Sequence, residues 1–189
     1  MTSVQRKRAD RACRLFLLAA AVSFLGWFGE TVYAYLSSGR FCDRGFLTLP
    51  VCPIYGISVF ALYWLLGLPQ GGGVLLRRVR GWQRLLIYVP LCFLIPTAAE
   101  LVTGWTFHRL FGLRLWDYSG KLWNFGGYIC LSFSVAWGIL LPLGMAFLFP
   151  PLKRFFFALK PKAAWWSMAL LLVVLAADLM WILCQKTLA

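Results

Sequence analysis

Three carboxylates lie inside stretches that are otherwise almost entirely apolar: Glu30, Glu100 and Asp178. A charge at membrane depth is costly unless a polar cavity or a partner group compensates it, so each of them marks a candidate functional site. Such a group could bind a cation or polar solute, or act as an acid or base. The other acidic residues fall in short polar segments and are Asp10, Asp43 and Asp117.

The surrounding sequence is that of a membrane protein. Its 189 residues are 61% hydrophobic, with a mean hydropathy of +0.76, which a soluble domain could not bury. Five apolar segments approach the roughly 20 residues that cross a bilayer. We therefore predict an all-α integral membrane protein with five transmembrane helices, at about 15–36, 51–68, 85–107, 128–149 and 164–184. Residues 1–14 are expected to form a frayed, basic cytoplasmic arm, and residues 15–189 a single transmembrane domain.

The net charge of +13 follows the membrane topology rather than a nucleic-acid surface. Thirteen of the nineteen Lys and Arg residues lie in the N-terminal arm and in the second and fourth connections. Positive residues concentrate on the cytoplasmic side, which predicts an N-inside, C-outside topology. We expect a multi-pass protein of the bacterial cytoplasmic membrane, with the lipid bilayer as its first partner.

Two connections are predicted to form ordered outer segments, at about 37–50 and 108–127. Both combine opposite charges with aromatic residues, which a simple solvated loop would not need. Irregular backbone at membrane depth must be covered or line a cavity, so we expect these segments to fold back onto the helices.

Two further interruptions of the apolar segments contain proline. Residues 69–73 (Pro-Gln-Gly-Gly-Gly) predict a flexible turn, and Pro150-Pro151 predicts the end of the fourth span.

Helical spacing places Trp27, Glu30 and Tyr33 on one face of the first span, and Glu100 on a small polar face of the third. These faces predict a shared polar cavity that Arg44 enters from the first outer segment. The alternative is a set of ion pairs that only fixes helix register, and for Asp178 that structural interpretation is preferred. The candidate cavity or substrate-binding residues are Glu30, Glu100, Arg44, Asp117, Trp27, Tyr33, Tyr55, Tyr118 and Asn124.

A series of motifs occurs in order along residues 24–140. The motifs are Gly26-Trp27-x-x-Glu30, Arg44-Gly45-Phe46-Leu47, Pro50-x-Cys52-Pro53-Ile54-Tyr55-Gly56, Glu100-x-x-Thr103-Gly104-Trp105, Trp116-Asp117-Tyr118-Ser119, Asn124 and Gly127. The chain thereby resembles the CmpB-type ABC-transporter permeases, small bacterial multi-pass membrane proteins with a related vertebrate transmembrane family. Tyr128 stands where that family often has an arginine. The resemblance implies transport, although the chain carries no ATPase motif.

Three classes of function remain open on these grounds. The leading one is a permease-like protein that binds or moves a small cationic or polar solute through an outward-facing cavity. The others are a membrane-embedded enzyme acting on lipid headgroups and a non-catalytic assembly subunit. A single histidine, His108, excludes a multi-His metal site within one chain, and no cofactor is assigned. Expected partners are a second copy of the chain, or an ATPase or another membrane subunit.

Cysteines add one further alternative. Cys42 and Cys52 bracket the first outer segment and are the best placed pair for a disulfide in an oxidising compartment. Free thiols packed among helices are the preferred interpretation.

Overall fold

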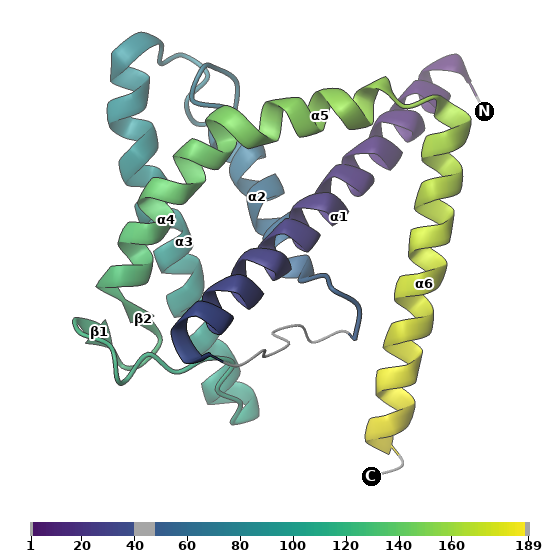
Figure 1. Ribbon diagram of the computed structural model, residues 1–189. Coiled ribbons are helices and arrows are strands. Elements are labelled where there is room, and N and C mark those ends of the chain that lie inside the picture. The colour runs from purple at the N-terminus through teal and green to yellow at the C-terminus, as the bar shows by residue number, and fades with distance from the viewer. Residues whose placement is uncertain (1, 40–47, 188–189) are drawn as a thin grey trace. The chain divides into compact units, whose positions relative to one another are not determined.

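The structure, a computed structural model, describes residues 2–39 and 48–187 (Figure 1). Its named secondary-structure elements are helices and one short antiparallel ribbon, in which Asn124 pairs with Cys130 and Phe125 with Ile129. The elements are α1 (Ser3–Ser38), α2 (Pro53–Leu66), α3 (Gly81–Phe111), β1 (Asn124–Phe125), β2 (Ile129–Cys130), α4 (Leu131–Leu143), the π-helix η1 (Gly144–Leu148), α5 (Phe149–Ala158) and α6 (Pro161–Thr187).

Four helical segments are long and apolar enough to cross a membrane: Ser3–Ser38, Gly81–Phe111, Leu131–Ala158 and Pro161–Ile182. The all-helical membrane class is therefore confirmed. The predicted second span forms α2, which has only 14 residues. At 1.5 Å per residue it extends about 21 Å, less than the roughly 30 Å hydrocarbon core. Five complete spans and the N-inside orientation stay predictions.

The expectation of a frayed N-terminal arm is wrong, because α1 begins at Ser3. Thr2 accepts a hydrogen bond from the backbone N–H of Gln5, and the Gln5 side chain accepts one from the backbone N–H of Thr2. This reciprocal capping box satisfies N–H groups that a helix start would otherwise leave open. The basic residues up to Arg14 are therefore the first turns of a long helix.

The helix does not end at Pro150 and Pro151 as predicted. The π-helical turn η1 precedes them, and the N–H of Phe149 donates to the carbonyl of Gly144. Both prolines then fall in the first turn of α5, where proline is tolerated. The helical segment consequently runs on to Ala158.

The chain divides into two compact units, residues 1–61 with 151–189, and residues 62–150. In the first unit α1 and α6 pack together near their starts (Figure 1). Cys13, Leu17 and Ala164 are buried at the centre of this contact. Arg14 Nη2 donates to the Leu159 carbonyl at 3.0 Å, and Trp165 Nε1 donates to Asp10 Oδ1 at 2.7 Å. Apolar packing and polar bonds thus hold the same helix pair.

Asp178 anchors another part of the first unit. This carboxylate is 9% exposed and accepts hydrogen bonds from the hydroxyl and N–H of Thr48, the latter at 3.0 Å, and from the N–H of Leu49 at 3.4 Å. These contacts support the structural interpretation of Asp178, since they fix the chain that leads into α2. In the same stretch Cys52 carries a free thiol. Cys42 lies outside the described residues.

In the second unit a buried arginine organises the loop between α2 and α3, residues 67–80. Arg84 is 2% exposed and donates only to backbone carbonyls. Its acceptors are Leu66 at 2.5 Å, Leu68 at 2.7 Å, Gly72 at 2.9 Å, Leu76 at 2.5 Å and Val79 at 3.5 Å. The turn predicted at 69–73 is present, but these bonds make it part of an arginine-centred loop rather than a flexible connection.

The remaining core of the second unit is the α3–α4 pair. Gly138 of α4 lies against Phe93 of α3, and a Cβ there would stand only 3.2 Å from the Phe93 Cβ. Small residues at such crossings let helix backbones approach closely in membranes. This close approach brings the polar face of α3 against α4.

Candidate functional site

Glu100, on α3, is the most distinctive polar group of the second unit. Its Oε1 accepts a hydrogen bond of 2.9 Å from Nε1 of Trp137 on α4. Its Oε2 is buried, and within the described parts of the chain it has no hydrogen-bond partner. A buried carboxylate oxygen without a partner loses its hydration without replacement. One oxygen is therefore held in place, while the other remains open to a ligand or a proton.

Aromatic residues cover α3 one turn beyond Glu100. Gly104 lies four residues further along, about 6 Å on the same helix face. A Cβ at Gly104 would stand 3.2 Å from both Trp116 and Tyr128. Trp116 Nε1 donates to the Tyr128 carbonyl at 2.8 Å, and the Tyr128 hydroxyl lies 2.7 Å from Nδ1 of His108. The segment predicted at 108–127 therefore folds back on α3 through Trp116, as its aromatic content predicted.

Asp117 orders the tip of this segment. Its carboxylate accepts hydrogen bonds from the hydroxyl and the N–H of Ser119, the latter at 2.9 Å, and pairs with Arg114 Nη1 at 3.1 Å. The Ser119 hydroxyl is the main reason why the pKa of the Asp117 carboxyl lies below its ordinary value, and the Ser119 N–H and Arg114 act in the same direction. Asp117 is thus the acceptor at the centre of a turn.

Asn124, the first residue of β1, completes the turn. Its Nδ2 donates to the carbonyl oxygens of Lys121 at 2.8 Å and Ser119 at 3.2 Å, and its Oδ1 accepts from the N–H of Gly127 at 3.2 Å. Gly127 has φ +75°, and a Cβ there would stand 2.6 Å from the Ser119 hydroxyl. Only glycine fits this position without strain. Tyr118, between these groups, stacks on Phe133 with ring centroids 4.8 Å apart.

A family model described as "Putative ABC-transporter type IV" (CmpB) matches residues 17–183. The chain belongs to this family. The match confirms the resemblance drawn from the motifs and extends it at both ends. No curated protein and no solved structure matches the chain. The family description and the four long apolar helices indicate a multi-pass membrane protein of the transporter type.

In this CmpB-family protein the predicted site residues fall into both units. Asp117, Tyr118 and Asn124 come together in one turn of the second unit, whereas Glu100 lies on α3 beside Trp137. Asp117 and Asn124 bond mainly within the segment itself, which gives them a role in shaping it. Arg44 lies outside the described residues.

The other predicted residues belong to the first unit. Glu30 and Trp27 are half-buried on α1, and Tyr33 is exposed. Tyr55 of α2 lies against Gly26 of α1, where a Cβ would collide with its ring. This contact joins the starting turns of α2 to α1. The cavity predicted between Glu30 and Glu100 stays a prediction.

Three residues that shape this site in the CmpB-family protein were not among the predicted ones. Trp137, which fixes Glu100, looks in sequence like one more aromatic residue of an apolar span. In the sequence Trp116 stands out only as part of a motif. Tyr128 stands out only as the replacement of an arginine, yet its hydroxyl lies beside His108 and its carbonyl accepts a hydrogen bond from Trp116. Within the described residues no three His, Cys, Asp or Glu side chains gather into a metal site.

Titration of Asp117 is expected to depend on Ser119. The carboxyl carbon of Asp117 should titrate below the ordinary midpoint of about 3.9, and Ser119→Ala should move the midpoint towards that value. Because the folded-state pKa is the lower one, Asp117 stabilises the turn above about pH 4, and this contribution disappears as the pH falls through the folded pKa. Carbon NMR of aspartate-labelled protein in micelles, assigned with Asp117→Asn, measures both midpoints. Equal midpoints in the two proteins would contradict the assigned role of Ser119.

Proposed function

We propose that this protein is a permease that binds a small cationic or polar solute at Glu100. The observation that carries the proposal is the state of that carboxylate: Trp137 holds Oε1, while the buried Oε2 has no partner among the described residues. A bound cation or hydrogen-bond donor would satisfy Oε2 and offset the cost of its burial.

The surroundings of Glu100 favour a cation over an anion. Aromatic rings attract cations through their π faces, and Trp116 and Tyr128 pack on Gly104, one turn from Glu100. His108, a further turn along α3, is engaged by the Tyr128 hydroxyl. The indole of Trp137 lies directly at the carboxylate. Carboxylate and aromatic groups together form the combination that recognises ammonium-type solutes.

The proposal has a wider form that includes the topology. With the N-terminus inside, α3 runs outward and Glu100 lies in the outer half of the membrane, so the site would open outward. An ATPase subunit is proposed as a partner, and these 189 residues contain no phosphate-binding loop.

Transport by proteoliposomes tests the proposal. Radiolabelled methylammonium, choline and glycerol serve as probes of a small cation, a quaternary cation and a neutral polar solute. At least one of them should enter faster than into protein-free liposomes, and Glu100→Gln should reduce that initial rate at least roughly tenfold, as loss of a charge-assisted contact implies. The amide of this variant keeps an oxygen acceptor for Trp137, so the fold should persist.

Asp10→Asn is the matched control, since Asp10 also accepts from an indole N–H, that of Trp165, but at the start of α1. Its uptake rate should equal that of the unmodified protein. Equal rates for Glu100→Gln and the unmodified protein, or no uptake of any probe, would reject solute binding at Glu100.

A further inference from the structure

The loop of residues 67–80 presents a basic pocket whose shape is fixed from within. Arg84 holds the carbonyls of the loop from the inside, and Tyr88 adds a bond of 3.0 Å to the Gly67 carbonyl. Gly67 and Gly73 both have positive φ and pass so close together that a Cβ on either would meet the backbone of the other strand of the loop. The outer surface of the loop therefore has a defined form.

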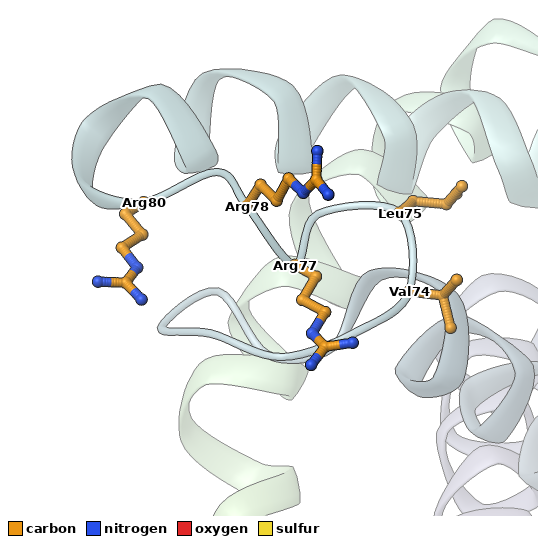
Figure 2. Close-up of a pocket in the computed structure, with 5 residues that line it drawn as sticks. All are labelled: Val74, Leu75, Arg77, Arg78 and Arg80. Atoms are coloured by element: carbon orange, nitrogen blue, oxygen red, sulfur yellow. The ribbon is translucent and has the colours of Figure 1, made fainter.

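Three arginines line this pocket on the surface of the loop. The cavity has a volume of about 710 Å³ and is bordered by Val74, Leu75, Arg77, Arg78 and Arg80 (Figure 2). All three arginines are exposed, unlike Arg84. Arg77 and Arg78 follow Val74 and Leu75 in the same stretch of the loop. Arg80 lies at the start of α3 (Figure 2). No acidic residue lies between Asp43 and Glu100 in the sequence, so no nearby carboxylate along the loop offsets these charges.

The start of α3 adds to the positive potential. Arg80 is the N-cap residue but makes no side-chain capping bond, and the first turn contains no acidic residue. The first N–H groups of a helix point away from it and carry the positive end of its dipole. They lie at the same end of α3 as Arg80, so the arginines and the helix terminus favour the same ligand, an anion.

The pocket also lies where lipid headgroups would be. α3 has 31 residues and extends about 46 Å, longer than the roughly 30 Å hydrocarbon core, so its ends project into the headgroup region. Exposed apolar side chains accompany the basic groups: Leu75 (58% exposed) and Val74 (56%) line the pocket, and Trp82 (70%) lies in the first turn of α3. Tryptophan at this level is typical of a membrane interface. A soluble anion would need none of these apolar groups.

We propose that this pocket binds the phosphate headgroup of an anionic phospholipid. Arg77, Arg78 and Arg80 contact the phosphodiester, and Val74, Leu75 and Trp82 lie against the glycerol and the first carbons of the acyl chains. This site is separate from Glu100 and does not depend on the transported solute. The arginines of the loop would thus bind a specific ligand, in addition to any influence of their charge on the membrane topology.

Native mass spectrometry of the detergent-purified protein tests the proposal, with phosphatidylglycerol and phosphatidylcholine of identical acyl chains as probes. Phosphatidylglycerol should bind more tightly, and the preference should fall with added salt. Each arginine near a membrane surface contributes roughly fivefold in affinity, so Arg77→Gln/Arg78→Gln/Arg80→Gln should weaken phosphatidylglycerol binding roughly a hundredfold. The single variant Arg78→Gln should weaken it roughly fivefold and remains informative if the triple variant does not fold.

The matched control removes three charges elsewhere. Lys7→Gln/Arg8→Gln/Arg11→Gln alters exposed residues of α1 and should leave phosphatidylglycerol affinity unchanged. Equal losses in both triple variants would show that only net charge matters and would overturn the proposal. So would displacement of phosphatidylglycerol by millimolar inorganic phosphate, because the ligand would then be a soluble anion.

Discussion

Replacing Arg84 by methionine is expected to lower the free energy of unfolding by about 4 kcal/mol, a large effect for a single substitution. The guanidinium donates to five carbonyls of the α2 end and the following loop while being 2% exposed. Methionine fills a similar volume but removes the guanidinium donor from all five carbonyls, of which those of Leu68 and Leu76 keep a backbone donor, the N–H groups of Gly71 and Val79. Unfolding by SDS in mixed micelles, followed by circular dichroism, measures the difference.

Two further substitutions test the cause of that loss of stability. Arg84→Lys keeps the charge but not the planar fork of donors, so it should lose about half as much. Arg109→Met removes an exposed arginine near the other end of α3 and should cost less than about 1 kcal/mol. If Arg84→Met were no worse than Arg109→Met, the carbonyl contacts would not hold the loop.

Asp178→Ala is expected to cost about 3 kcal/mol, because it leaves the N–H groups of Thr48 and Leu49 without an acceptor at a buried position. Asp178→Asn keeps one acceptor oxygen and should fall between the unmodified protein and Asp178→Ala. The same SDS titration measures both variants, with Asp10→Ala as the counterpart that loses one bond to Trp165 at an exposed contact.

The Asp178 series also separates structure from transport. If Asp178→Ala reduced uptake of a probe without lowering stability, the carboxylate would belong to the solute path rather than to the anchor of residues 48–49. The contacts of Asp178 with Thr48 and Leu49 predict instead that Asp178→Ala lowers both the stability and the amount of folded protein in the membrane.

Long-range hydrophobicity made the helices predictable, but not where they begin and end. The spans containing Glu30, Glu100 and Asp178 lie inside α1, α3 and α6, because an apolar run of some 20 residues has few other structures open to it. The start of α1 depended on a local cap at Thr2, and the continuation past Pro150 depended on a π-helical turn. Such local hydrogen bonds are hard to predict from the amino-acid composition of a segment.

The site was predictable in its residues more than in its contacts. Glu100 was identified because a carboxylate is conspicuous among apolar neighbours. Its partner Trp137 is 37 positions away and could not be chosen among ten tryptophans without the packing of α3 on α4. In the sequence Arg84 looks like one more cytoplasmic charge, and nothing in its neighbours shows that the chain before it bends back to surround it.

The arginine-centred loop bears on how the protein enters the membrane. Every carbonyl that Arg84 holds lies within the 18 residues that precede it, so the ring of contacts closes over a short chain and at a small entropic cost. Until Arg84 has been synthesised, the Leu66 carbonyl at the end of α2 lacks its guanidinium donor. The short helix α2 is therefore expected to stay in the translocation machinery until the first turns of α3 have been made. The two helices then enter the lipid together, with the charge of Arg84 already bonded to the loop carbonyls.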